Sequence, residues 1–325
     1  MPVNQGFAAQ AHIPLQHLSG VGHEVSLLTL GTSSFGSLER AAPVYDRYAE
    51  RGGTFFDSAW VYGVNYSPGC CERTLGDWMS SRGVSGQMTV LVKGGHPPHC
   101  TPGELGAQLA ESLGRLQLDH AGLYMLHRDD TSIPVGEFVD ALQSLVQRGL
   151  AGAYGFSNWT LARVGEAIAY AHSHGLPGPA ALSNQLSLAV MHRPVYPGCI
   201  HVADTAARQW LEREEIALIP WSSQGRGVFT AVESEADFRE GNLAECWFSS
   251  DNWQRVGRAR MLAADRGVQP VNIALAWVLH QPFPTFPIIG PRTREELDTS
   301  LDALSVRLSD EELAWLNLEA HEGDA

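Results

Sequence analysis

Residues 55–63, Phe-Phe-Asp-Ser-Ala-Trp-Val-Tyr-Gly, govern the interpretation of the whole chain. Phe55 and Phe56 predict the end of a buried strand, and Asp57 is the first charge after them. Tyr62 follows on the loop, before a glycine whose backbone can adopt angles that other residues resist. A carboxylate at a strand end with a phenol above it indicates acid–base chemistry at the mouth of a barrel. The same residues also suit an N-cap aspartate and an ordinary loop tyrosine, so the other strand ends decide.

A short apolar run followed by a polar or glycine-rich corner recurs along the chain. The eight corners begin at Gly31, Asp57, Lys93, His127, Ser157, Asn184, Trp221 and Gly290. All intervals but the last fit one strand, one helix and their loops. Apolar residues three and four apart, such as Leu105, Leu109 and Leu113, predict helices with one buried face between the corners. Strands that alternate with helices predict a parallel sheet, and eight such units predict a closed (β/α)8 TIM barrel of the α/β class.

The first residues and the long last interval complete this prediction. Residues 13–25 alternate around glycines and predict a hairpin before the first unit. The last interval contains two helix-like stretches, 253–266 and 271–280. The segment 225–251 before them is rich in Gly, Ser and acidic residues, and we expect a long loop over the barrel mouth after the seventh strand. We therefore expect residues 1–325 to form a single barrel domain.

Composition excludes several classes of partner. The 325 residues are 44% hydrophobic and 18% charged, which is typical of a globular protein. A net charge of -14 argues against nucleic acid, because a protein binds it by releasing counterions from phosphates with Lys and Arg. No apolar stretch approaches the roughly 20 residues of a membrane helix. Residues 1–12 lack the basic start and apolar run of a signal peptide.

The cysteines and histidines give no metal motif. The five cysteines are Cys70, Cys71, Cys100, Cys199 and Cys246. Their odd number and unpaired spacing predict free thiols in a reducing cytoplasm. In His96-Pro-Pro-His99-Cys100 the prolines oppose the helical spacing that such ligands usually have. We expect a cytoplasmic protein without a metal site and without membrane or nucleic-acid partners.

Four polar residues stand at three consecutive corners, Asp57, Tyr62, Lys93 and His127, and active sites of such barrels lie at the carboxyl ends of the strands. A lysine directly after an apolar strand costs desolvation unless a carboxylate meets it, and Asp57 stands on the neighbouring strand. The ammonium would favour the Tyr62 phenolate and lower its pKa from about 10, which would make the phenol a usable proton donor near neutral pH. His127 would orient a substrate oxygen. Each residue alone is compatible with a structural role, but the four together predict catalysis.

This constellation resembles the aldo-keto reductase superfamily, whose members combine a (β/α)8 barrel, an Asp, Tyr, Lys, His tetrad and a nicotinamide cofactor. The resemblance covers nearly the whole chain, from Leu30 to Leu304. The stretch 57–63 matches the first signature of the family, and Leu126-His127 matches its histidine strand. The resemblance implies an NAD(P)H-dependent carbonyl reductase, in which hydride passes from the nicotinamide to an aldehyde or ketone carbon and Tyr62 gives a proton to the oxygen.

The resemblance also implies the cofactor contacts. Ser157 and Asn158, assisted by Gln185, would hold the nicotinamide carboxamide. Trp221 would stack on the nicotinamide, at a position where many members have tyrosine, and the residues after it would wrap the diphosphate. The last corner would grip the adenosine end, although relatives often carry Gln and Asn where this chain has a glutamate and a serine. The full set is Gly31, Thr32, Ser157, Asn158, Gln185, Trp221, Ser222, Gln224, Arg226, Gly290, Arg292, Thr293, Glu296 and Ser300.

Arg292 favours NADPH over NADH. It is the first cation after the last predicted strand, and a guanidinium can hold a 2′-phosphate by two parallel hydrogen bonds. Thr293 is placed to cap the following helix, whose first N–H groups favour an anion. Glu295 and Glu296 oppose this, because they would repel the phosphate or accept a ribose hydroxyl. We expect NADPH, and NADH stays possible.

The substrate is expected to be a small-molecule carbonyl, and the hydroxyl- and charge-rich corners favour a polar, sugar-like one. Trp60, His96, Arg128 and Trp159 are the residues expected to line its site. Two other functions stay open. A Schiff-base aldolase would also place a lysine, here Lys93, at a barrel strand end, and a redox-sensing accessory protein would bind the nicotinamide with little turnover. The sequence does not indicate the oligomeric state.

Overall fold

The computed structural model describes residues 12–65 and 67–319, and the expectation about residues 1–12 lies outside this part except for His12. Eight parallel strands form one sheet in the order β10-β3-β4-β5-β6-β7-β8-β9. Their bounds are β3 Thr29–Gly31, β4 Phe55–Ala59, β5 Thr89–Gly94, β6 Ala121–Leu126, β7 Ala151–Ser157, β8 Ala181–Ser183, β9 Ala217–Leu218 and β10 Ile288–Ile289. Leu218 pairs in parallel with Thr285, just before β10, so the last strands meet and the sheet closes. The predicted (β/α)8 barrel is confirmed.

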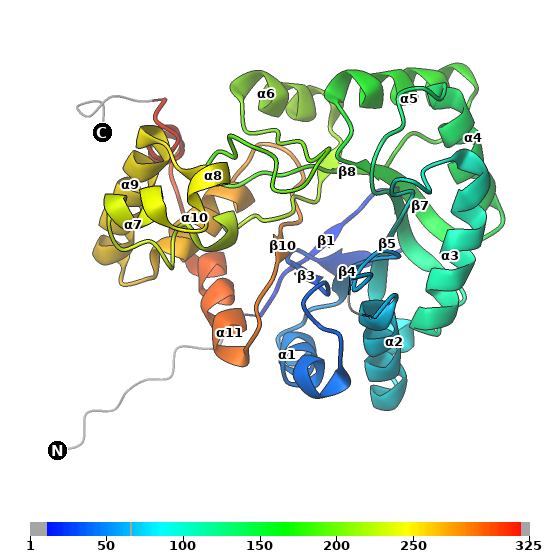
Figure 1. Ribbon diagram of the computed structural model, residues 1–325, viewed down its shortest axis with the longest axis horizontal. Coiled ribbons are helices and arrows are strands. Elements are labelled where there is room, and N and C mark those ends of the chain that lie inside the picture. Colours follow the sequence, from blue (N-terminus) through cyan, green and yellow to red (C-terminus); the bar gives the residue numbers. More distant parts are fainter. Residues whose placement is uncertain (1–11, 66, 320–325) are drawn as a thin grey trace.

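Helices follow the strands and surround the sheet, with α1 to α6 in an arc and α9, α10 and α11 beyond them (Figure 1). Their bounds are α1 Leu38–Glu50, α2 Cys70–Arg82, α3 Pro102–Leu116, α4 Val135–Gln147, α5 Leu161–Ser173, α6 Thr205–Glu214, α9 Ser250–Arg266, α10 Pro270–Leu279, α11 Arg294–Asp302 and α12 Asp310–Leu316. Leu105, Leu109 and Leu113 share the buried face of α3, as their spacing predicts. None of the helices in the described ranges is long and apolar enough to cross a membrane.

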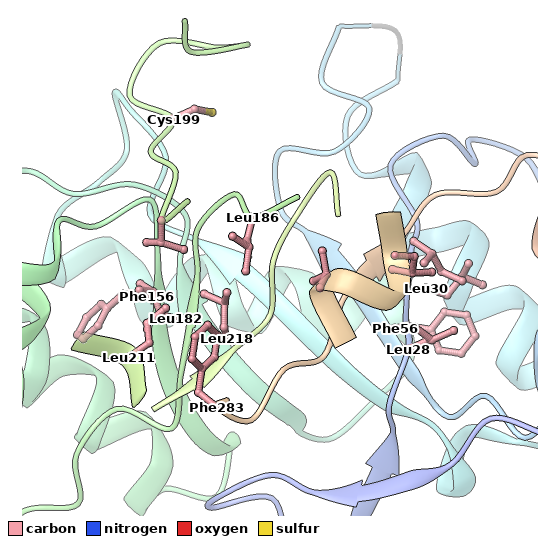
Figure 2. Packing of buried hydrophobic residues seen from close by; sticks show 14 of the residues in the cluster. Leu28, Leu30, Phe56, Phe156, Leu182, Leu186, Cys199, Leu211, Leu218 and Phe283 are labelled. Atoms are coloured by element: carbon pink, nitrogen blue, oxygen red, sulfur yellow. The ribbon is translucent and has the colours of Figure 1, made fainter. Parts of the chain in front are cut away.

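Strand side chains alternate between the barrel interior and the helix layer. Phe55 lies in an interior cluster with Leu91 of the next strand, whereas Phe56 packs outward, with its ring 5.5 Å from that of Trp78 on α2. Figure 2 shows the outward set in two groups on opposite sides of the barrel. One group contains Leu28, Leu30 and Phe56, and the other contains Phe156, Leu182, Leu211, Leu218 and Phe283. Because side chains two apart in a strand share a face, Asp57 points into the barrel as Phe55 does.

The hairpin predicted before the first unit is confirmed. β1 (Leu15–His17) and β2 (Glu24–Ser26) pair in antiparallel fashion. Leu18, Val21 and Val25 pack into the interior cluster, so the hairpin covers one end of the barrel. The turn lies close to the sheet: Gly20 has a φ of +73°, and a Cβ there would stand 2.8 Å from the Ala153 Cβ. A side chain at this position would displace the hairpin from the barrel.

The connection after β9 is long, as predicted, but it is partly helical. The short helices α7 (Glu235–Glu240) and α8 (Ala244–Trp247) lie beside α9 in Figure 1. Ser234 and Asp237 form a capping box at the start of α7, so some of the acidic residues are those of a first helical turn. Phe238 is buried, with its ring 5.4 Å from that of Phe248. The acid-rich composition had suggested only an irregular loop.

Candidate active site

Asp57 and Lys93 form a buried ion pair inside the barrel. Asp57 lies within β4, which continues to Ala59, so it does not follow the strand as the sequence had suggested. Ala59 is in register with Lys93 on β5, and the interior faces of the two strands bring the side chains together. The Lys93 ammonium contacts Asp57 Oδ1, and both residues are 2% exposed. The expected contact between the two side chains is therefore present.

Tyr62 stands above this pair, on the connection between β4 and α2. Its hydroxyl donates to Asp57 Oδ2 at 3.0 Å, and Lys93 Nζ lies 5.3 Å from its ring centroid. Burial of the hydroxyl and the neighbouring Asp57 carboxylate raise the pKa of Tyr62 well above its usual value. The expected lowering of the Tyr62 pKa by Lys93 is wrong, because burial and the Asp57 carboxylate act in the opposite direction. Tyr62 is therefore a neutral phenol at neutral pH and has a proton to give.

His127 follows β6 and lies beside Tyr62, with 6.0 Å between the two ring centroids. Its main-chain N–H donates to the Gly94 carbonyl at 2.6 Å, which fixes the backbone at this corner. Burial, reinforced by the positive charge of Lys93 and Arg128, lowers the pKa of His127 well below its usual value. A neutral imidazole has one N–H and one acceptor nitrogen. His127 can therefore donate one hydrogen bond to a substrate oxygen without carrying charge.

The corners after β7 and β8 form one buried polar group. The Ser157 hydroxyl donates to the Ser183 carbonyl at 2.8 Å, and Asn158 Nδ2 donates to Ser157 Oγ at 2.9 Å. Gln185 Nε2 donates to Ser187 Oγ, but Gln185 Oε1 is buried and has no hydrogen-bond partner in the described part of the chain. A buried acceptor without a donor is costly unless a ligand supplies one. The orphaned oxygen fits the amide N–H of a nicotinamide carboxamide.

Trp221 stands at the corner after β9, where its side chain packs against both the interior and the outer cluster. Its indole nitrogen is buried and unpartnered among the described residues, as the Gln185 oxygen is. The half-exposed ring is available for stacking. This corner therefore also fits a nicotinamide ring.

The corners after β9 and β10 are joined by hydrogen bonds. Gln224 Nε2 donates to Ser300 Oγ at 3.0 Å, and Thr293 Oγ1 accepts from the Glu296 N–H and caps α11. The Glu296 carboxylate accepts from the main-chain N–H of Arg292 at 2.6 Å. The side chain of Arg292 is exposed and donates no hydrogen bond within the described ranges. The structure thus brings together the residues expected at the adenosine end and leaves one guanidinium available.

Five other expected cofactor residues, Gly31, Thr32, Ser222, Arg226 and Gly290, follow β3, β9 and β10 or end them. Thr32 is buried and its hydroxyl donates to the Asp57 carbonyl, so it joins β3 to β4 directly after Gly31. Ser222 and Arg226 adopt left-handed backbone angles, with φ of 51° and 54°. The exposed Arg226 guanidinium lies 5.9 Å from the Tyr196 ring. Gly290 is exposed beyond β10.

The sequence model of the Aldo/keto reductase family matches residues 27–317. The chain belongs to the aldo/keto reductase family. Norsolorinic acid reductase stcV of Emericella nidulans is 29% identical over 93% of this chain and 79% of its own length. The uncharacterized oxidoreductase YrpG of Bacillus subtilis is 28% identical over 93% of this chain and 94% of its own. An aryl-alcohol dehydrogenase (NADP(+)) of Phanerodontia chrysosporium is 26% identical over 92% of this chain and 83% of its own length. The protein is accordingly an oxidoreductase.

Two residues expected on the substrate side of this aldo/keto reductase are engaged elsewhere. Trp159 is fully buried and stacks on Phe156 at 4.1 Å, so it does not line an accessible site. Asn158 has a φ of 58°, and this left-handed residue turns the chain back toward the core. Arg128 is 8% exposed and donates to the His127 and Pro197 carbonyls, so its guanidinium supports a loop. Its positive charge still acts on His127, and a substrate contact by either residue stays a prediction.

Trp60 and His96, the other two residues expected to line the substrate site, are both half-buried. The Trp60 indole N–H donates to Glu111 Oε2 on α3 at 2.6 Å, and the ring stands edge-on to that of His99 at 5.9 Å. The His96 ring lies 5.3 Å from that of His127. His96 therefore stands next to the histidine that contacts Tyr62, whereas Trp60 packs toward α3 and His99.

Sequence reasoning missed the loop between β8 and α6. The main-chain N–H of Ile200 donates to Asn158 Oδ1 at 3.1 Å, and the Ile200 carbonyl accepts from the Gln185 N–H. This loop therefore fixes two residues of the expected carboxamide corner. Its sequence contains only proline and glycine as a signal, and these indicate a turn and not a contact.

Proposed function

We propose that the protein is an NADPH-dependent carbonyl reductase in which Tyr62 is the proton donor. The observation that carries this proposal is the Tyr62 hydroxyl, which is held by Asp57 and stands beside the neutral His127. A bound reduced nicotinamide would supply the hydride, and Ser157, Asn158, Gln185 and Trp221 would hold it. His127 would donate a hydrogen bond to the carbonyl oxygen and orient it. Tyr62 would transfer its proton to that oxygen, and a proton from solvent would then restore the phenol.

The substrate class follows from the side chains that remain at the mouth. Of the four residues expected to line the mouth, Trp159 is fully buried and Arg128 is 8% exposed, whereas the Trp60 and His96 rings are half-buried and would supply an aromatic wall. Aromatic walls favour flat apolar groups. Two relatives, one named for norsolorinic acid and one for aryl alcohols, also support an aryl carbonyl as the substrate. We therefore favour an aryl aldehyde or ketone over the sugar-like carbonyl expected from the sequence.

The proposal is tested by following nicotinamide absorbance with a panel of aryl, alkyl and sugar carbonyls. We expect multiple turnovers with NADPH and the highest kcat/KM for aryl carbonyls. Two other functions give different results in the same assays. A Schiff-base aldolase would be labelled on Lys93 by substrate and borohydride. A redox-sensing accessory protein would bind the cofactor tightly and turn over negligibly with every carbonyl.

Trp221 provides a direct readout of cofactor binding. If its ring stacks on the nicotinamide, addition of NADPH should quench tryptophan fluorescence. Trp221→Ala should remove much of that quench and weaken cofactor binding, and Trp315→Phe, in the distant helix α12, should leave both unchanged. A full quench in Trp221→Ala would show that the nicotinamide lies elsewhere.

Arg292 is expected to discriminate between the two cofactors. Its exposed guanidinium lies at the start of α11, where N–H groups favour an anion. A charge-assisted contact with the 2′-phosphate contributes about 1.5–3 kcal/mol, so Arg292→Ala should weaken NADPH binding about ten- to a hundredfold. NADH binding should hardly change, because NADH lacks that phosphate. Equal losses for both cofactors in titrations, or tighter binding of NADH by the unaltered protein, would contradict this assignment.

A cytoplasmic location is also proposed. The five cysteines form no disulfide, which fits a reducing compartment. Fractionation of cells that produce the protein would test this.

A further inference from the structure

The segment that carries Tyr62 is a connection of ten residues, 60–69, between β4 and α2. Among the described residues of this segment, which exclude residue 66, main-chain N–H groups donate from Trp60 to the Lys93 carbonyl, from Tyr62 to Ala59, from Val64 to Val61 and from Ser67 to Gly63. The first two bonds hold the start of the segment on β5 and β4. Near its other end Arg73 of α2 donates to the Pro68 carbonyl at 2.7 Å. The Tyr62 hydroxyl lies within reach of Asp57 only if the start of the segment has the right position over the barrel.

Arg115, on α3, donates to this segment at its first end and packs against it at its second. At the first end its Nη1 donates to the Trp60 carbonyl at 3.3 Å. At the second end the guanidinium lies against Gly69, where a Cβ would stand 2.5 Å from the Arg115 Nε. Gly69 has a φ of +70°, and no side chain caps the helix that follows it. One side chain therefore contacts both the residue that enters the segment and the residue that leaves it.

Two carboxylates fix the Arg115 guanidinium. Nη1 also donates to Glu72 Oε2 at 2.9 Å, and the Glu72 side chain, in the first turn of α2, is completely buried. Nη2 contacts Glu111 Oε1, whose other oxygen accepts from the Trp60 indole. The Arg115 side chain itself is 13% exposed. A guanidinium with both sides of its fork occupied has little freedom, so its other contacts are held in place.

We propose that Arg115 is a positioning residue for Tyr62, and that it sets the distance between the phenol and the substrate oxygen by clamping the two ends of the segment 60–69. The inference rests on the proposed function, since it assumes that Tyr62 gives the proton. Arg115 contacts neither Asp57 nor the expected cofactor corners. Its loss should therefore slow proton transfer and leave cofactor binding unchanged.

The test uses Arg115→Lys, which keeps a cation beside Glu72 but lacks the fork that reaches Trp60 as well. We expect turnover to fall about 10- to 100-fold, because a misplacement of about 1 Å has effects of that size. The dissociation constant for NADPH should be unchanged. The solvent isotope effect on kcat should rise, since proton transfer becomes slower relative to the other steps. In the Tyr62→Phe background, Arg115→Lys should cause no further loss, because the donor is already absent.

A matched control is Arg82→Lys, which alters an exposed bidentate pair with Asp46 at the other end of α2. It should leave turnover and the isotope effect unchanged. Arg115→Met combined with Glu72→Gln removes the clamp without leaving a buried charge, and should behave as Arg115→Lys does. Unchanged turnover in both Arg115 variants, or the same factor of loss with and without the Tyr62 hydroxyl, would overturn the inference. If Tyr62→Phe itself retains turnover, the proposed function fails instead.

Discussion

Tyr62→Phe is expected to lower turnover by about 10²-fold or more and to leave the fold and NADPH affinity nearly unchanged. The change removes one oxygen, which donates to Asp57 Oδ2 at 3.0 Å. Burial and that carboxylate raise the pKa of Tyr62, so the phenol has its proton at neutral pH. Without it, the developing alkoxide must take a proton from water that reaches a half-buried site. Single-turnover and steady-state reduction of an aryl aldehyde would measure the loss.

Tyr170→Phe is a matched control for this change. Tyr170 lies on α5, and its hydroxyl donates to Asp140 Oδ2 at 2.9 Å, so the variant also removes a phenol–carboxylate hydrogen bond. It should turn over at the rate of the unaltered protein. If Tyr62→Phe did the same while binding NADPH normally, another group would have to be the donor.

The sequence was sufficient for the barrel because its signals are local and repeated. The order of the corners made the strands of Asp57 and Lys93 neighbours, and the two side chains do meet. The end of β4 was less predictable. Pairing of Ala59 with Lys93 extends the strand beyond Asp57, and that pairing is a property of the sheet. The two side chains meet all the same, because the register brings their interior faces together.

Directions of side chains near the site depended on contacts distant in the sequence. Trp159 follows the carboxamide corner directly, but the left-handed Asn158 turns it onto Phe156. Arg128 follows His127 directly, but a loop some seventy positions later accepts its hydrogen bonds, at Pro197. Proximity along the chain suggested both residues for the site, but it did not indicate these tertiary contacts.

The sign of the Tyr62 pKa shift shows the same limit. Position along the chain indicated that a lysine and an aspartate stand near the phenol. It did not indicate which of the two lies closer to the hydroxyl. The Asp57 carboxylate accepts a hydrogen bond from the phenol, whereas the Lys93 ammonium lies 5.3 Å from the ring centroid and contacts that same carboxylate. Burial of the hydroxyl and the Asp57 carboxylate together raise the pKa of Tyr62, the reverse of the expected shift.

The Lys93–Asp57 pair is expected to give the largest effect on stability. Both side chains are 3% exposed and each is the other's counter-ion, so loss of one leaves a buried charge uncompensated. Lys93→Met and Asp57→Asn should each lower the free energy of unfolding by about 3–5 kcal/mol. Asparagine retains an oxygen that can accept from Tyr62, so the loss reports mainly on the charge. Denaturant unfolding of the apoprotein would measure both changes, and turnover should fall in parallel.

The double variant distinguishes a pair from two independent residues. With both charges removed, neither is left uncompensated, so Lys93→Met with Asp57→Asn should cost clearly less than the sum of the single changes. The pair of Arg47 and Asp298 is a suitable control, because its side chains are 20% and 39% exposed. Arg47→Met should cost at most about 1 kcal/mol, as is usual for ion pairs near the surface. Strict additivity for Lys93 and Asp57 would mean that the two side chains do not interact, and Tyr62 would then lack the paired carboxylate that holds its hydroxyl.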